Sequence, residues 1–271
     1  ISALNVAGMI AFDTETTSTD PLRADLVGIS MAVHEGQGYY IPVGHTGLTK
    51  QLPIPEVIDA LKPAFTNPEI AKAGHNIKYD ALVLGNYGLE VFPLTFDTML
   101  AEWLVDPASH NLGLKDMADT HLNISMTHIE ELIGKGKNQV TMDGVAVEAA
   151  ALYAAADAEV TLRLVPLLKK KMEDRKCTRI FEEIEMPLVP VLMSMERAGI
   201  CLDAEFFKKF SGEMGTRLRA IEDQVYQSVG YPFNLNSTQQ LSKVLFETLR
   251  LEPPDRNKKT ASGHYSTSAA V

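Results

Sequence analysis

The apolar positions of the first 175 residues alternate between short β-branched runs and longer stretches with helical spacing. Three runs separated by turn residues predict consecutive strands in an antiparallel meander, at 8–12, 25–33 and 38–43. A further short strand is predicted within 70–76. Helical spacing occurs at 55–65, 77–88, 96–106, 114–122 and 145–175. We expect the last of these helices to be interrupted near Pro166, because an interior proline removes a helix hydrogen bond. The pattern predicts an α/β fold in which helices pack on a mixed sheet.

After residue 175 the pattern changes to helices without strands. Helices are expected over 179–200, 203–230 and 236–250. Asp203, and either Asn236 or Ser237, are predicted helix N-caps. The final stretch, 256–271, is polar, basic and rich in Gly, Ser and Thr, which predicts a flexible loop. We therefore expect two domains, 1–175 and 176–271.

The composition is that of a soluble globular protein, with 45% apolar and 22% charged residues among 271. No apolar run reaches the about 18 residues that a membrane-spanning helix needs, so we expect no membrane contact. The two cysteines, Cys177 and Cys201, have the spacing of neither a metal site nor a redox pair. This usage predicts a reducing cytoplasmic location.

The net charge of −10 belongs entirely to the first predicted domain. Residues 1–175 hold 13 basic and 23 acidic residues, whereas residues 176–271 hold 12 of each. An acidic domain argues against general nucleic-acid binding through a broad basic face. It leaves room for a small site in which metal ions offset carboxylates.

The first predicted strand ends in two acidic residues, Asp13 and Glu15, within the stretch FDTET. The period of two along a strand places both on the same side, where like charges repel unless a positive charge lies between them. A solvated turn explains an isolated Asp-x-Glu more often than a site does. Two further features change this interpretation.

Asp80 follows a predicted strand, in the first turns of a helix, and Tyr153 and Asp157 are stacked at i and i+4 on one helix face. Asp157 lies in a run of small residues that is expected to pack tightly, so its carboxylate needs a partner or an ion. Considered singly, Asp80 and Asp157 are each explained by a solvent-exposed position on a helix. Together, four carboxylates suit Mg²⁺, which prefers oxygen ligands, and two such ions can hold a phosphodiester. A tyrosine hydroxyl can orient the attacking water.

The stretches FDTET, NIKYD and YAAADAEVT, in this order and spacing, resemble the exonuclease motifs of family-A DNA polymerases. Tyr153, four residues before Asp157, is similar to the tyrosine branch of the four-carboxylate exonucleases; the histidine branch has His where this chain has Leu152. The stretches FDTMLAEWLVDP, IEELIGKGKNQVT and EEIEMPLVPVLMSMERAGICLD resemble the Klenow-type large fragment. FNLNSTQQLSKVLFETLRL and KKTASGHYSTSAAV resemble the base and tip of its thumb. The resemblance covers essentially the whole chain.

This resemblance implies a ribonuclease-H-like exonuclease fold for 1–175 and the first, all-α thumb part of a polymerase domain for 176–271. It implies 3′→5′ proofreading of single-stranded DNA ends with two Mg²⁺ ions, for which Mn²⁺ or Zn²⁺ can substitute. By the same resemblance, the residues holding the first ion are Asp13, Glu15 and Asp157. Asp13 then bridges to a second ion whose waters Asp80 holds, and Tyr153 positions the nucleophilic water.

The resemblance also assigns DNA contacts. Thr16, Asn76 and Tyr79 match positions that contact the frayed 3′ terminus. Ile129 stands where an aromatic residue stacks on a terminal base, and Thr19 stands where a leucine wedge is common. Because base stacking on an aromatic contributes about 1–3 kcal/mol, we expect a weaker grip on the 3′ nucleotides.

The basic tip of the thumb-like segment, with Lys258 and Lys259, is expected to contact the phosphates of duplex DNA, although a solvated loop explains it equally well. No palm or fingers sequence follows Val271, and neither D-Y-S nor H-D elements occur. We therefore expect that this polypeptide does not polymerise and that the parent chain continues into palm and fingers.

Two other functions remain open from the sequence. The chain could be a non-catalytic structural and DNA-positioning part of a polymerase. It could also be an RNA-trimming exonuclease of the same superfamily, against which the thumb-like segment counts.

Overall fold

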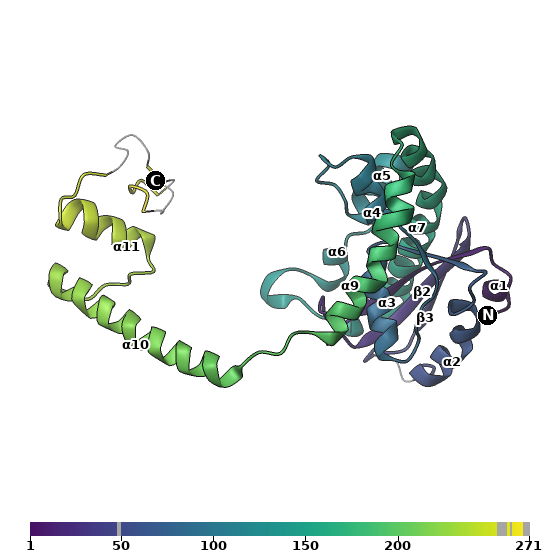
Figure 1. Cartoon of the computed structure of the whole chain (residues 1–271), viewed down its shortest axis with the longest axis horizontal. Helices are drawn as coiled ribbons and strands as arrows, with labels where there is room; N and C mark the ends of the chain where they lie inside the picture. The colour runs from purple at the N-terminus through teal and green to yellow at the C-terminus, as the bar shows by residue number, and fades with distance from the viewer. Residues whose placement is uncertain (48–49, 254–258, 261, 268–271) are drawn as a thin grey trace. The chain divides into compact units, whose positions relative to one another are not determined.

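The computed structural model describes residues 1–47, 50–253, 259–260 and 262–267 (Figure 1). The chain divides into two compact units, Ile1–Gly199 and Ile200–Val271. None of the described helices is long and apolar enough to cross a bilayer. The domain boundary expected at residue 175 remains a prediction. The two compact units of the structure meet between residues 199 and 200.

A five-stranded mixed sheet forms the centre of the first unit, in the order β3-β2-β1-β4-β5. Its strands are β1 (Met9–Thr16), β2 (Leu26–His34), β3 (Gln37–Pro42), β4 (Ala71–Gly74) and β5 (Leu94–Asp97). The first three strands are antiparallel neighbours, which confirms the predicted meander, while β4 runs parallel to both β1 and β5. The parallel strands β1, β4 and β5 therefore bring their carboxyl ends to one edge of the sheet.

Helices flank this sheet, as the sequence predicted (Figure 1). The α-helices of the unit are α1 (Ser2–Asn5), α2 (Ile54–Phe65), α3 (Ile77–Asn86), α4 (Thr98–Val105), α5 (Leu114–Leu122), α6 (Ile129–Ile133), α7 (Val147–Arg175), α8 (Thr178–Ile180) and α9 (Met186–Ala198). Two 3₁₀ turns, Gly136–Asn138 and Met142–Gly144, and a π-helical turn, Phe181–Glu185, complete it. Helix α7 packs against β1 to β4, and α9 contacts α3 and β5.

The core lies between the sheet and these helices. Phe12 of β1 is fully buried and meets Phe65 of α2 edge to face, with ring centroids 5.4 Å apart. Phe96 of β5 packs on Phe181 at 4.9 Å. Alternation along β1 therefore places Phe12 and Thr14 on one side of the strand, and Asp13 and Glu15 on the other.

Close packing of α7 on the sheet depends on small residues. A Cβ on Gly38 of β3 would lie 2.3 Å from the backbone oxygen of Ala155, so only glycine allows this approach. Ala154 and Ala158 of the same helix are fully buried. The small-residue run therefore brings the neighbouring Asp157 close to the sheet.

Two sequence predictions are corrected. Helix α7 runs from Val147 to Arg175 without interruption although Pro166 lies inside it. Buried Leu164, Val165 and Leu168 hold both sides of the proline against the core, and this packing outweighs one lost backbone hydrogen bond. The helix predicted from residue 96 begins at Thr98, because the preceding four residues form the short strand β5.

The second unit consists of α10 (Ala204–Val229), α11 (Thr238–Ser242) and a π-helical segment, Lys243–Thr248. The side chain of Asp203 accepts from the backbone N–H of Phe206, which confirms this predicted cap. The side chain of Ser237 accepts from the backbone N–H of Gln240, so Ser237, of the two predicted alternatives Asn236 and Ser237, is the cap of α11. Its only β feature among the described residues is an isolated bridge between Lys259 and Tyr265. This all-α character was predicted.

Candidate active site

Three carboxylates from distant parts of the chain meet at the carboxyl end of β1. Asp13 and Glu15 come from the strand, and Asp157 comes from α7. One carboxylate oxygen from each of the three residues lies within 4.8 Å of the other two. Among the described residues, these three carboxylates form a group whose geometry could hold a metal ion. The strand period and the tight packing of α7 together produce the cluster.

Asp80 is hydrogen-bonded to Thr14, the residue of β1 that lies between Asp13 and Glu15. The backbone N–H of Thr14 donates to Asp80 Oδ1 at 2.9 Å, and the Thr14 hydroxyl donates to the same oxygen at 2.6 Å. Asp80 is 2% exposed, so these hydrogen bonds replace water as its polar partners. Asp80 is therefore near enough for its charge to act on Asp13, but the group with metal-binding geometry contains only Asp13, Glu15 and Asp157.

The helix that carries Asp80 is fixed by Asp97, which the sequence analysis did not identify. Asp97 caps α4 and also accepts from the backbone N–H groups of Asn76 at 3.1 Å and Ile77 at 2.9 Å. One buried carboxylate thereby joins the N-termini of α3 and α4. The signal was available as an aspartate directly before a helical stretch, which is a common N-cap pattern.

Burial and mutual repulsion raise the pKa of the clustered carboxylates. Burial is the largest cause of the raised pKa of Asp13, followed by the charges of Asp80 and Asp157. Burial likewise raises the pKa of Glu15, with the charge of Asp13 as the second cause. For Asp80, burial raises the pKa to about 8 against the opposing effect of the Thr14 hydrogen bonds. The cluster is therefore costly to ionise unless it has cationic partners.

Tyr153 stands beside Asp157 on α7, as the i and i+4 spacing predicted. Burial is the main reason that the pKa of Tyr153 is raised, and the nearby charge of Asp157 is the second cause. Lys115 of α5, which the sequence analysis did not identify, forms an ion pair with Asp157 Oδ1. Its ammonium also lies 4.0 Å from the centroid of the Tyr153 ring.

A groove of about 660 Å³ opens next to the cluster. Its lining includes Glu15, and also Thr16, Asn76, Tyr79 and Ile129. The Tyr79 hydroxyl is hydrogen-bonded to Thr16 Oγ1 and to the backbone oxygen of Ser18. The groove therefore collects the four residues that the sequence assigned to the 3′ terminus.

The basic tip that is predicted to contact duplex DNA contains Lys258 and Lys259. Lys259 belongs to the second unit and is exposed, with its ammonium 5.1 Å from the Tyr265 ring centroid. Lys258 lies outside the described residues.

The donor set fits a hard divalent cation. The three acidic side chains of the cluster, Asp13, Glu15 and Asp157, offer oxygen atoms, and this cluster contains neither thiol nor imidazole ligands. Carboxylates whose ionised form is disfavoured by burial and repulsion gain free energy when a cation binds between them. The site can thus bind a metal ion.

Comparison with known families supports this geometry. The 3′-5′ exonuclease family matches residues 1–173, and the DNA polymerase family A matches residues 204–271. The chain is 42% identical over its whole length to DNA polymerase I of Chloroflexus aurantiacus and 40% identical to that of Pseudomonas aeruginosa. It spans 29% and 30% of the length of these two relatives.

Solved structures show the same architecture. The POL domain of Pol1 from M. smegmatis, in complex with DNA primer-template and dNTP, matches 99% of this chain and 41% of its own length, with 25% identity and a TM-score of 0.73. The NrnC protein of Brucella melitensis with bound Mg²⁺ matches 72% of this chain and 88% of its own length, at 21% identity and a TM-score of 0.56, which shows a shared fold. The chain belongs to the family-A DNA polymerases, and its residues 1–173 are their ribonuclease-H-like 3′-5′ exonuclease domain.

Proposed function

We propose that the first unit removes nucleotides one at a time from the 3′ end of single-stranded DNA, using two Mg²⁺ ions. The observation that carries this proposal is the convergence of Asp13, Glu15 and Asp157, with ligand oxygens within 4.8 Å, beside an open groove. Mn²⁺ or Zn²⁺ would substitute, because carboxylates bind these ions as well.

In this proposal each acidic residue has a distinct task. Asp13, Glu15 and Asp157 would hold one ion, Asp13 would also serve the second, and Asp80 would orient the water of the second. Divalent ions at such a site supply Lewis-acid stabilisation of the phosphate and lower the pKa of water. Tyr153 orients the attacking water through its hydroxyl. It does not act as the base, because burial raises its pKa further above neutrality.

The groove is the proposed place of the terminal nucleotides. Thr16, Asn76 and Tyr79 line it and present hydroxyl and amide groups, which suit the sugar and phosphate of a frayed end. Ile129 contributes an aliphatic surface in place of an aromatic ring. A contact between Ile129 and a base would exclude water but would not provide the stacking that an aromatic ring gives.

The test is digestion of a 5′-labelled single strand with and without Mg²⁺. We expect a ladder of products shortened from the 3′ end, which disappears with EDTA. In Asp13→Ala the rate should fall by roughly a hundred- to a thousandfold, the effect of removing one electrostatic stabiliser of a transition state. The matched control is Asp119→Asn, which removes an exposed carboxylate from α5 and should keep the wild-type rate.

Two results would redirect the assignment. Intact DNA at high protein and metal concentration indicates the non-catalytic, DNA-positioning role. Faster digestion of a single-stranded RNA of the same sequence indicates the RNA-trimming alternative. Both arms use the same label, so the products are compared on one gel.

The remaining assignments concern the chain outside the cluster. We propose that 1–175 is the exonuclease domain and that 176–271 is the first part of a polymerase domain, supported by the two family matches. Exposed Lys259, together with Lys258, is proposed to contact duplex phosphates. Cys177 and Cys201 are free thiols, which supports the proposal of a reducing cytoplasm.

A further inference from the structure

Lys115 introduces a positive charge into the carboxylate cluster from a different helix. It is the second residue of α5, and its side chain is 16% exposed while that of Asp157 is 9% exposed. The ammonium is paired with Asp157 Oδ1 and lies over the face of Tyr153. It therefore has two partners in the site, a carboxylate and an aromatic ring.

The influence of this charge reaches beyond its direct partner. Lys115 interacts electrostatically with Asp13 and with Glu15, the other two carboxylates of the cluster. A single ammonium thus acts on the three residues whose oxygens could hold a metal ion. Because the pair is largely buried, water screens this interaction weakly.

A lysine and a divalent ion cannot both approach Asp157 closely without repelling each other. We propose that Lys115 is an internal counter-cation: it neutralises the cluster when metal is absent and competes with divalent ions for Asp157. This inference rests on the proposed metal-dependent function. It makes Lys115 a positioning residue that sets metal affinity, not a residue that touches the substrate.

The structure also provides space for the displaced ammonium. Lys115, Tyr153 and Asp157 line a second cavity of about 220 Å³, whose other walls include Met126 and Leu132. The flexible four-carbon stem of lysine allows its charge to move into such a space when a metal ion arrives.

The experiment measures metal affinity directly in the full chain. Mn²⁺ is titrated into wild type and into Lys115→Met, and free Mn²⁺ is followed by its electron paramagnetic resonance signal. Removing a neighbouring unit charge should tighten Mn²⁺ binding by about tenfold. In EDTA the same variant should unfold at a lower temperature than wild type, because the carboxylates lose their only direct cationic partner among the described residues.

Two controls separate this effect from net charge. Lys170→Met removes the same charge from an exposed position on α7, where Lys170 pairs with Asp174, and should leave Mn²⁺ affinity unchanged. Lys115→Arg retains the charge and should bind Mn²⁺ within about threefold of wild type. If Lys115→Met does not fold, Lys115→Gln is titrated in its place.

The outcomes distinguish this inference from the proposed function. Wild type that binds Mn²⁺ and digests DNA, with equal or weaker Mn²⁺ binding in the neutral Lys115 variants, overturns the counter-cation role alone. Absence of Mn²⁺ binding in every protein overturns both. Tighter binding in Lys115→Met but not in Lys170→Met supports the inference.

Discussion

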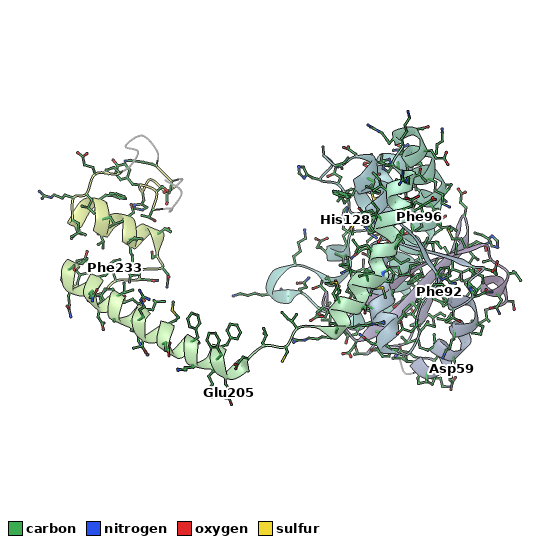
Figure 2. The ribbon with its side chains drawn as sticks, in the orientation of Figure 1. Asp59, Phe92, Phe96, His128, Glu205 and Phe233 are labelled. Carbon is green, nitrogen blue, oxygen red and sulfur yellow. The ribbon has the colours of Figure 1, made fainter. Side chains whose placement is uncertain are left out.

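In residues 1–199 the large apolar side chains close a core between the sheet and its helices, whereas those of α10 face solvent (Figure 2). Phe12 and Phe65 of the first unit are fully buried. Phe206 of α10 is 57% exposed, and α10 contains no buried residue over its whole length. Among the described residues of the second unit, only Ser242 and Val244 are buried.

This difference shows what a carboxylate cluster requires. Burying Glu15 and Asp80 costs free energy, and the extensive core of the first unit offsets that cost. The described residues of the second unit have apolar side chains of similar size but little burial, and its two α-helices begin at the capping side chains of Asp203 and Ser237. The exonuclease chemistry therefore resides in the unit that can hold acidic groups in fixed positions.

The largest effect should come from matched phenylalanine substitutions in the two units. Phe12→Ala removes a buried ring that packs on Phe65 and should lower the free energy of unfolding by about 3–5 kcal/mol. Phe206→Ala should change it by less than about 0.5 kcal/mol. Urea unfolding of the first unit is followed by the fluorescence of Trp103, the single tryptophan, which lies in α4. Unfolding of the helices of the second unit is followed by far-ultraviolet circular dichroism of the same samples. Equal effects of the two substitutions would contradict the contrast between the units.

A similar comparison uses two lysines. Lys72 of β4 is fully buried, and its ammonium donates to the backbone oxygens of Asn67, Ile70 and Phe92 at 2.7, 2.7 and 2.8 Å. Lys72→Met leaves these carbonyls without a donor and should destabilise the first unit by about 3 kcal/mol. Lys208→Met, at an exposed position of α10, is the control and should be nearly neutral. A neutral Lys72→Met in urea unfolding would show that water replaces the ammonium.

The buried carboxylate Asp80 should make the stability of the first unit depend on pH. Burial raises the pKa of Asp80 to about 8, whereas its unfolded value is about 3.9. Between these values the folded state binds more protons than the unfolded state, so the free energy of unfolding decreases as pH rises. In EDTA the Trp103 transition should therefore move to lower urea between about pH 4 and about pH 8, and should level off above that range.

Two additions sharpen this pH experiment. Mg²⁺ should reduce the loss, because it binds the ionised carboxylates. Asp80→Asn should flatten the curve in EDTA. A curve that rises with pH in EDTA would mean that the carboxylates are already ionised and paired in the metal-free protein.

A smaller effect is expected in the groove. Ile129→Phe supplies an aromatic surface beside Tyr79 and should tighten binding of a short single strand by about fivefold, within the usual contribution of base stacking. The measurement is fluorescence anisotropy with a labelled oligonucleotide in Ca²⁺ to limit cleavage. Ile133→Phe, which alters another residue of the same groove, tests whether the gain depends on position. Unchanged affinity in Ile129→Phe would remove Ile129 from the proposed DNA contacts.

The smallest effect is expected from removing the second unit. A chain ending at Gly199 retains the sheet, its core and all four carboxylates. Its Mn²⁺ affinity and single-strand digestion rate should stay within about twofold of the full chain, because a compact unit with its own core folds alone. A large loss of digestion with normal metal affinity would show that residues 200–271 help to hold the substrate.

The sequence by itself determined the type of most elements and the identity of the acidic residues. The meander, the helical second unit and the caps at Asp203 and Ser237 follow from local patterns, because side-chain period and capping chemistry act within a few residues. The three motif stretches also identified Asp80 and Asp157, although more than 60 residues separate each from Asp13 or from one another.

Only the tertiary structure decided the rest. Helix α7 continues through Pro166 because the core holds both of its halves, and β5 forms because β4 offers a neighbouring edge. Asp97 joins two helix starts, and Lys115 reaches Asp157 from another helix. These contacts link residues far apart in the chain, and local patterns carry no information about which distant partner satisfies a buried charge.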